Sequence, residues 1–321
     1  MRDGWPVTTE SRRLSAMATG SLDAPAARLA RPGMAKVRSY VALTKPRIIE
    51  LLLITTLPTM FVAKRGVPSV TLMLATLIGG TLAAGGANAT NMVIDRDIDK
   101  LMHRTQRRPL VTGEMTPRAA LVFAVALEVI AFVQLWLTVN LLSACLAVSA
   151  TAFYVFIYTL WLKRNYSSNI VIGGAAGAVP VLVGWAAVTG TLSWAPVVLF
   201  AIIFVWTPPH FWALAIRYRD DYEAADVPML PVVATFARTA RQILLYTILL
   251  VALTLVFALV GHMGPLYVVS AIVLGAMFIG YCLKLRRTLD TPTALKVFKF
   301  SISYLSVLFV VMALDVVIRH P

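Results

Sequence analysis

Nine hydrophobic stretches, each long enough to cross a lipid bilayer, constrain the fold of this chain more than any other feature. A helix needs about 17–25 mainly apolar residues to span the hydrocarbon core. Lipid offers the backbone no hydrogen-bond partners, so each stretch is expected to be helical. We therefore predict an all-α, polytopic membrane bundle of about nine transmembrane helices. The predicted spans are 47–65, 70–94, 118–138, 141–162, 168–188, 193–216, 241–261, 264–284 and 299–318.

Composition agrees with a membrane protein. Of the 321 residues, 59% are hydrophobic and 14% are charged, whereas soluble domains carry about 25% charged residues. The net charge of +14 is expected of loops that face an anionic leaflet, so it does not indicate nucleic acid, and we expect no nucleic-acid partner. Cys145 and Cys282 both lie in apolar stretches, which leaves no disulfide framework and no cysteine metal site.

Lysine and arginine are distributed unevenly between the two sides of the predicted bundle. With the N-terminus inside, 26 of the 29 lie on inner segments, and the outer segments hold Lys64, Arg65 and Arg319. This asymmetry predicts a cytoplasmic N-terminus. The two long connections, 95–117 and 217–240, then share the cytoplasmic side and follow spans of the same direction. This arrangement suggests a duplicated four-helix unit followed by a ninth helix.

The chain before the first span is rich in Arg, Ala and Ser and has no apolar segment of the kind found in secretory signals. We expect residues 1–45 to form a disordered, basic cytoplasmic tail. The remaining part, 46–318, is expected to be the transmembrane domain.

A polar stripe marks the end of the second span. Successive helical residues advance by about 100°, so Asn88, Asn91, Asp95 and Asp99 fall within an arc of about 80°, and Asp97 points elsewhere. Carboxylates and amides gathered at a membrane surface repel one another unless a cation lies between them. Mg²⁺ is the natural candidate, because it binds oxygen ligands and is commonly held by one or two carboxylates plus substrate phosphates.

Basic residues follow the stripe along the chain. Arg104 and Arg108 are predicted to bind phosphate oxygens through their planar guanidinium groups, while Arg107 is equally typical of a solvated loop. The fourth span ends in Tyr158 and then Lys163–Arg164. These residues are compatible either with phosphate binding or with an anchor at the membrane surface.

The second long connection carries another acid cluster. Asp220, Asp221 and Asp226 follow the sixth span, and two acid clusters at the mouths of parallel helices are compatible with a two-metal diphosphate site. The sequence leaves open which of the three would bind metal. Glu223 is expected to be solvated.

The sixth span contains His210, which follows two prolines and lies between Trp206 and Trp212. If the span stays helical to its end, His210, Arg217 and Asp221 share one face. The histidine could ligate a haem iron or orient a substrate. Taken alone, the pattern favours a structural histidine in an interfacial aromatic belt.

Together these motifs resemble the UbiA superfamily of intramembrane prenyltransferases. The resemblance covers roughly residues 40–318. In the second cluster many members carry a regular Asp-xxx-Asp, whereas Asp221 and Asp226 are five apart here and position 222 is Tyr. The matching segments are Asn91-xxx-Asp95-xxx-Asp99, Arg104-Thr-xx-Arg108-Pro109, the acid cluster with Val-Pro-Met-Leu-Pro231, Pro209-His210-Phe-Trp-Ala-Leu-Ala, and Lys163-Arg164 before Asn169-Ile-Val-Ile-Gly-Gly174.

Within the family, the resemblance is greatest to members that act on haem. It implies Mg²⁺-dependent transfer of a farnesyl group from farnesyl diphosphate to a vinyl group of haem B, giving haem O and diphosphate, in haem A biosynthesis for terminal oxidases. It also implies a multi-pass protein of the bacterial inner membrane, embedded in the lipid bilayer, with its active site on the cytoplasmic side.

The resemblance also implies roles for individual residues. The implied catalytic residues are Asn91, Asp95, Asp99 and Asp221. The implied metal ligands are Asp95, Asp99, Asp220, Asp221 and Asp226. The implied substrate-binding residues are Asn88, Arg104, Arg108, Tyr158, Lys163, Arg164, His210 and Arg217.

Two other functions remain open at this point. One is a related prenyltransferase that acts on a quinone precursor. The other is a secondary transporter of an anionic solute, because duplicated halves and interrupted helices are transporter features too. A partnership with haem A synthase or with cytochrome oxidase assembly also stays open.

Overall fold

The computed structural model describes residues 32–320 of the chain. Nine helices in this part are long and apolar enough to cross a membrane, and this part contains no strand. The all-α prediction is therefore confirmed. The spanning helices are α3 (Pro46–Lys64), α4 (Val70–Ile94), α7 (Pro117–Thr138), the continuous run of α8 (Leu141–Ala152), η1 (Phe153–Leu162) and α9 (Lys163–Asn165), α10 (Asn169–Thr189), α11 (Trp194–Arg217), α14 (Phe236–Val260), α15 (Pro265–Thr288) and α16 (Thr291–Arg319).

Two predicted spans begin later than the helices that contain them. The structure starts α14 at Phe236 and α16 at Thr291, where the sequence predicted 241 and 299. Both helices open with a charged turn or two, carrying Arg238 and Lys296, before the apolar stretch begins. A helix continues past the hydrocarbon boundary as long as its backbone is hydrogen-bonded, so hydropathy alone places its start too late.

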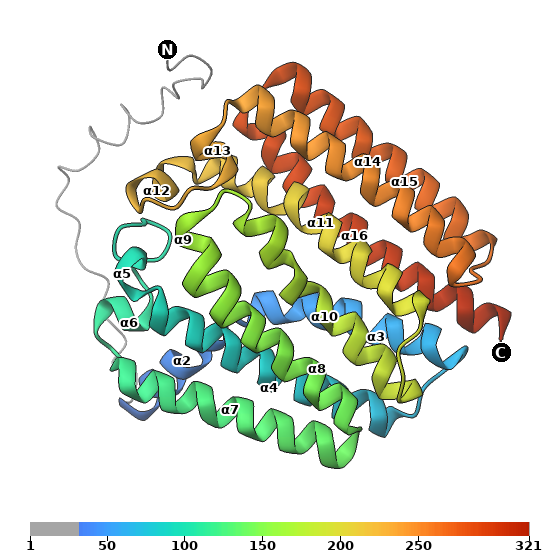
Figure 1. Cartoon of the computed structure of the whole chain (residues 1–321), viewed down its shortest axis with the longest axis horizontal. Helices are drawn as coiled ribbons and strands as arrows, with labels where there is room; N and C mark the ends of the chain where they lie inside the picture. Colours follow the sequence, from blue (N-terminus) through green and yellow to red (C-terminus); the bar gives the residue numbers. More distant parts are fainter. Residues whose placement is uncertain (1–31, 321) are drawn as a thin grey trace.

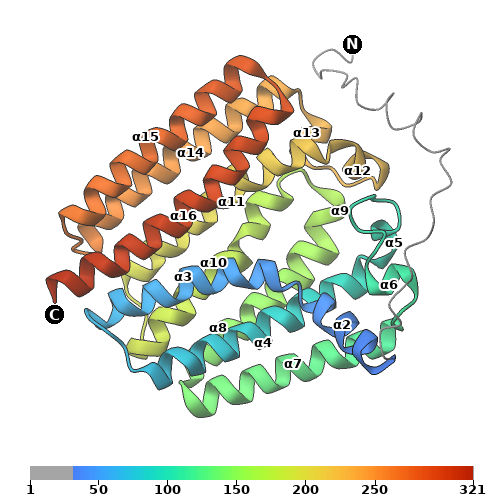
Figure 2. The same cartoon turned by 180° about the vertical axis from the view of Figure 1, so that it is seen from behind.

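The spanning helices form a ring of neighbours. Each helix packs on the next along the chain, through α3, α4, α7, α8, α10, α11, α14, α15 and α16, and α16 returns to pack on α3. Additional contacts join α3 to α10 and α11 to α16. Figures 1 and 2 show the same closed arrangement from its two faces.

The short elements gather at one end of the bundle, here called the loop end (Figure 1). They are α5 (Arg96–Asp99) and α6 (Pro109–Thr112) in the first long connection and α12 (Arg219–Ala224) and α13 (Leu230–Val233) in the second. The C-terminus lies at the opposite end. The prediction that both long connections share one side is thus confirmed, and which side faces the cytoplasm stays a prediction.

Helix α2 (Pro32–Thr44) corrects the prediction of a disordered tail up to residue 45. It packs against α4 and α6. Leu43 is fully buried, and the Tyr40 ring meets the Phe123 ring edge-on with centroids 4.8 Å apart. The burial of Leu43 and the packing of the partly buried Tyr40 order a segment whose average composition is typical of a tail. Residues 1–31 of the predicted tail lie outside the described residues.

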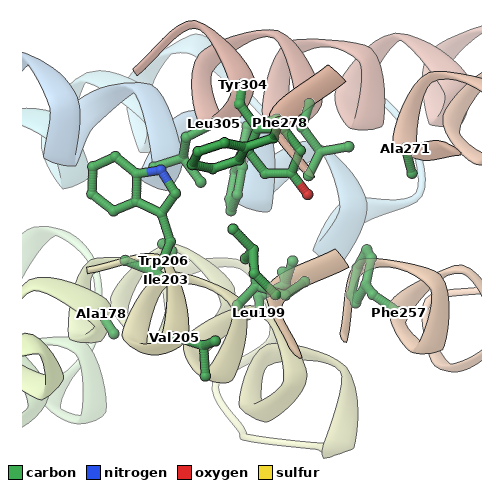
Figure 3. Close-up of a cluster of buried hydrophobic side chains, with 14 of the residues drawn as sticks. Ala178, Leu199, Ile203, Val205, Trp206, Phe257, Ala271, Phe278, Tyr304 and Leu305 are labelled. Atoms are coloured by element: carbon green, nitrogen blue, oxygen red, sulfur yellow. The ribbon is translucent and has the colours of Figure 1, made fainter. Parts of the chain in front are cut away.

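The largest apolar core lies between α10, α11, α14, α15 and α16. Figure 3 shows Trp206 and Ile203 of α11 facing Tyr304 and Leu305 of α16, with Phe278 of α15 beside them. This packing fixes the helix that carries the Pro-Pro-His segment against α16.

Asp315 is a buried acid on α16 that the sequence analysis did not single out. Its carboxylate accepts hydrogen bonds from the backbone N–H groups of Gly264 (2.6 Å) and Tyr267 (3.3 Å), at the start of α15. Arg319 lies 3.8 Å away. The acid therefore caps one helix from its neighbour, where free N–H groups would otherwise stay unpaired.

Replacement of this acid gives a test of the cap. We expect Asp315→Ala to lower the free energy of unfolding by about 1–3 kcal/mol, because buried N–H groups lose their acceptors, and Asp315→Asn to cost less, because its carbonyl oxygen still accepts. Thermal unfolding in detergent micelles measures the difference. Glu223→Ala, at an exposed position of the loop end, is the control. Equal stability of Asp315→Ala and wild type would contradict the cap.

Candidate active site

The predicted polar stripe exists and is buried. Asp95 is 0% exposed, Asp99 2% and Asn91 3%. The backbone keeps helical hydrogen bonds through the junction of α4 and α5, since Asp95 N–H donates to Asn91 O and Asp99 N–H to Asp95 O, each at 2.9 Å. The three side chains therefore lie one above another, about 6 Å apart along the axis at each step. Their placement agrees with the prediction.

Each acid of the stripe has a basic partner. The Lys163 ammonium is paired with Asp95 Oδ2, and Arg108 Nη1 lies 2.5 Å from Asp99 Oδ2. Asn91 Nδ2 also donates to Asp95 Oδ2, at 2.8 Å. A carboxylate removed from water is stable only when it is paired in this way. The structure thus joins the end of span two, the first loop and the end of span four at one point.

Lys45 is a site residue that the sequence analysis did not single out. Its ammonium donates to Asn91 Oδ1 at 2.8 Å. The pKa of Lys45 is lowered to about 7, mainly by burial and also by the nearby charges of Arg108 and Lys163, while Asp95 and Asp99 act in the opposite direction. Sequence spacing could not reveal this contact, because Lys45 comes from the junction of α2 and α3, 46 positions before Asn91.

A π-helix, η1, lies directly before Lys163 in the fourth span. Over Phe153–Leu162 the backbone widens, and the Thr159 hydroxyl donates to Tyr154 O at 2.8 Å. The same hydroxyl accepts from Asn91 Nδ2 at 3.2 Å. Tyr158 stacks on Tyr154 with ring centroids 5.4 Å apart. π-helical turns are rare and occur often at functional sites.

Arg164 pairs with Asp97 instead of with the stripe. Its two terminal nitrogens each lie 2.7 Å from one Asp97 oxygen. This hydrogen bonding lowers the pKa of Asp97 to about 2. The side chain of Asp97 is 59% exposed, so the prediction that it points away from the stripe is confirmed. The nearest approach of Arg164 to Asp95 is 3.9 Å.

Asp221 joins the second long connection to the first. Its two carboxylate oxygens accept from the backbone N–H groups of His103 (3.2 Å) and Arg104 (3.3 Å). The Arg104 guanidinium lies 5.1 Å from the Tyr222 ring centroid and 6.0 Å from that of Tyr218, within cation–π range. The two loops are thereby held against each other over the stripe.

Other predicted residues lie farther from the stripe. Asp220 has a side chain that is 97% exposed and pairs with Arg219, and Asp226 and Arg217 are exposed as well. Arg107 is exposed, which matches its interpretation as a solvated charge. Asn88 is buried and donates to Thr44 O at 3.0 Å, so it fixes the end of α2 to α4.

His210 is buried against α16. Its Nδ1 lies 2.8 Å from Ser301 Oγ, and its ring stacks on Trp206 at 4.2 Å between centroids, with Phe298 at 4.7 Å. His210 and Arg217 both lie in α11, but the expected continuation of their face to Asp221 is wrong, because α11 ends at Arg217 and a new helix starts at Arg219. The turn at Tyr218 redirects Asp221 toward the first loop.

The donor set of the stripe fits Mg²⁺ that arrives with a phosphate ligand. Asp95 Oδ1 is buried and makes no hydrogen bond, which leaves one anionic oxygen for a cation. The residues that the structure describes contain no cluster of three or more His, Cys, Asp or Glu side chains for a metal. Mg²⁺ does not need such a cage, since one or two carboxylates and substrate phosphates suffice.

Comparison with known proteins adds independent information. A model described as the UbiA prenyltransferase family matches residues 52–306. The protoheme IX farnesyltransferase of Frankia alni is 54% identical over 287 residues, which cover 88% of this chain and 99% of that protein. The protein of the same name from Streptomyces avermitilis is 50% identical over 295 residues, covering 90% of this chain and 97% of the relative.

Solved structures share the fold. A structure from work on digeranylgeranylglyceryl phosphate synthase in membranes matches with a TM-score of 0.73 at 18% identity, covering 88% of this chain and 99% of that one. A UbiA homolog from Archaeoglobus fulgidus, bound to DMAPP and Mg²⁺, matches with a TM-score of 0.64 at 18% identity, covering 87% and 99%. At this identity the matches establish the architecture of the bundle and no more.

The contact between the two loops can be tested at Asp221. We expect Asp221→Ala to free the 100–108 loop, because two backbone N–H groups lose their shared acceptor. Trypsin should then cleave after Arg104 or Arg107 several times faster than in wild type, which timed digestion with mass spectrometry detects. Asp220→Ala removes the exposed neighbouring acid and should leave the cleavage rate unchanged. Identical rates in both variants would contradict this contact.

Proposed function

Because the chain belongs to the UbiA prenyltransferase family, we propose that it transfers a farnesyl group from farnesyl diphosphate to a vinyl group of haem B. The products are haem O and diphosphate. One observation carries the proposal: a buried stripe of amide and carboxylate groups, each matched to a basic side chain, lies at the end of an apolar bundle. Relatives at 50–54% identity that carry the name protoheme IX farnesyltransferase support this choice of donor and acceptor.

We assign the metal to the first acid cluster. Asp95 and Asp99 would hold Mg²⁺, with Asp95 Oδ1, which accepts no hydrogen bond, as a protein ligand and Asn91 beside it. When bound, Mg²⁺ neutralises charge on the departing diphosphate. From the second cluster we retain Asp221, because it lies against the first loop, and leave out the exposed Asp220 and Asp226.

Basic residues of the loop end would bind the diphosphate. Lys163 and Arg108 already lie at the stripe, and Arg104 is held at its edge by Tyr222. Guanidinium groups offer paired N–H donors that match phosphate oxygens. Arg164 lies near Asp95 but pairs more closely with Asp97, so it would help to position the α5 segment.

In the proposed reaction, the diphosphate leaves at the polar loop end while the farnesyl chain and the haem lie in the apolar bundle. The bond between farnesyl C1 and the bridging oxygen breaks, and its electron pair leaves with diphosphate. The terminal vinyl carbon of haem B then bonds to C1. A water oxygen adds to the other vinyl carbon and releases one proton, which completes the hydroxyethyl group. Apolar surroundings protect the allylic cation from bulk water until the haem reacts.

His210 is the residue that we assign to the haem. The Ser301 hydroxyl donates to Phe298 O at 2.6 Å, which leaves its oxygen as the acceptor in the 2.8 Å contact with His210 Nδ1. We therefore assign the imidazole proton to Nδ1, which would leave the lone pair of Nε2 for the haem. A histidine oriented through one nitrogen commonly ligates metal through the other.

The location of the protein follows from its helices. Nine spanning helices in the described part make it a multi-pass membrane protein. We propose the bacterial inner membrane, with the loop end in the cytoplasm, on the basis of the lysine and arginine asymmetry. The loop-end position of the acids also favours an enzyme over a transporter, whose sites lie near the bilayer midplane.

The decisive experiment is direct. Purified protein in lipid nanodiscs is mixed with haem B, farnesyl diphosphate and Mg²⁺, and the product mass and released diphosphate are measured. The proposal requires both haem O and diphosphate in equal amounts. If the protein farnesylates a quinone precursor and not haem B, the proposed haem farnesyltransferase function is wrong, and the chain is a prenyltransferase of quinone precursors.

Two acids on the same short segment separate catalysis from structure. We expect Asp95→Asn to lower kcat/KM by about three orders of magnitude, because the buried stripe loses a charge that acts on the diphosphate. Asp97→Asn removes an exposed ion pair and should change the rate by about twofold at most. Steady-state assays of both variants at saturating Mg²⁺ make the comparison. Similar losses in the two variants would remove the stripe from the mechanism.

His210 gives a test of the acceptor site. We expect His210→Ala to weaken haem B binding and shift its Soret absorption, while farnesyl diphosphate binding stays within about twofold of wild type because the stripe is untouched. His262→Ala, at an exposed histidine of the opposite end, is the control. If His210→Ala instead loses affinity for farnesyl diphosphate and leaves the haem spectrum unchanged, His210 belongs to the phosphate site.

A further inference from the structure

Lys45 adopts a backbone conformation that its side chain does not favour. Its φ of 52° and ψ of 64° lie in the left-handed region, where the Cβ of a non-glycine residue comes too close to the following carbonyl oxygen. The following Pro46 starts α3, so the chain turns sharply between α2 and α3. Such strain persists where the surroundings hold it, often at functional sites. Here the surroundings include the hydrogen bond from Lys45 to Asn91.

The three cations of the site lie at successive levels of the stripe. Lys45 contacts Asn91, Lys163 pairs with Asp95, and Arg108 pairs with Asp99. Helix α4 runs toward the loop end, so Asn91 is the deepest of the three acceptors, about 12 Å along the axis from Asp99. The Lys45 ammonium is therefore the cation on the membrane side of the site.

Lys45 also differs from the other two cations in its partner. Lys163 and Arg108 each have a carboxylate within ion-pair distance, whereas the contact of Lys45 is a neutral amide oxygen, and no carboxylate among residues 32–320 lies within 4.0 Å of its ammonium. Of these three cations, Lys45 is therefore the one whose charge a bound anion can neutralise without breaking an ion pair.

The orientation of a prenyl diphosphate follows from these levels. Its hydrocarbon chain is expected to extend into the apolar bundle, which puts the α-phosphate on the membrane side and the β-phosphate toward the loops. We infer that Lys45 binds the α-phosphate and donates a hydrogen bond to the bridging oxygen that leaves C1, while Arg108 binds the β-phosphate. This inference rests on the proposed function and adds a binding residue and a direction to it.

Farnesyl monophosphate separates the two levels, because it has an α-phosphate only. We expect Lys45→Gly to weaken its binding at least tenfold, as the loss of a charge-assisted hydrogen bond predicts. Glycine accepts the positive φ, so the backbone keeps its turn. Arg108→Met should leave monophosphate binding within about twofold and weaken farnesyl diphosphate binding about tenfold. Isothermal titration calorimetry in nanodiscs measures each dissociation constant.

The controls separate this inference from the proposed function. Arg107→Met, at an exposed arginine of the same loop, should bind both ligands like wild type, and Lys45→Met repeats the loss of charge with a side chain of similar length. If either Lys45 variant that keeps the wild-type Tm binds farnesyl monophosphate normally, or if Arg108→Met loses it equally, the inference is overturned. Failure of wild type to bind farnesyl diphosphate would instead reject the proposed function.

Discussion

The loop end is organised around one requirement, the burial of Asp95 without exposure to water. A carboxylate in an apolar bundle is unstable unless opposite charge and hydrogen bonds surround it. Lys163 supplies the charge and Asn91 a hydrogen bond. These partners come from α4 and from α9, the short turn that follows the π-helix at the end of span four, so the acid fixes two spans to each other. Arg108 repeats the arrangement one turn higher at Asp99 and brings in the first loop. These pairs therefore attach the two helix ends and the first loop to one another at the stripe.

Irregular backbone at the loop end serves the same requirement. A regular α-helix through Phe153–Leu162 would turn Thr159 and Lys163 by different angles from those of the π-helix seen here. Lys45 reaches Asn91 only because the chain adopts left-handed φ before Pro46. The π-helix and the left-handed turn at Lys45 are both locally less stable than regular backbone, and each places a polar group against the same stripe. Several other spanning helices start at ordinary side-chain caps, such as Thr116 before α7, whose hydroxyl accepts from Ala119 N–H.

Features that depend on one segment could be predicted from the sequence, and features that depend on contacts between distant segments could not. Hydropathy and the exclusion of unpaired backbone from lipid locate all nine spans, because both act within one segment. Helical spacing places Asn91, Asp95 and Asp99 together for the same reason. The partner of each acid could not be predicted, since Lys163 is 68 positions away from Asp95 and Lys45 is 46 positions away from Asn91. The turn at Tyr218, which directs Asp221 to the first loop, and the cap by Asp315 depend likewise on contacts between helices distant in sequence.

Charge explains why a site of this kind can bind a highly charged substrate beside a membrane. Three cations, Lys45, Lys163 and Arg108, face two carboxylates, Asp95 and Asp99, so these five groups together carry one positive charge when all are ionised. One Mg²⁺ would raise this to three, which equals the three negative charges of a fully ionised prenyl diphosphate. The charge of Lys45 is the adjustable part, because burial places its pKa near 7 and an approaching anion favours its protonated form. Binding of the diphosphate would thus complete the neutralisation that burial of the stripe begins, and departure of the diphosphate would leave the carboxylates to pair again with Lys163 and Arg108.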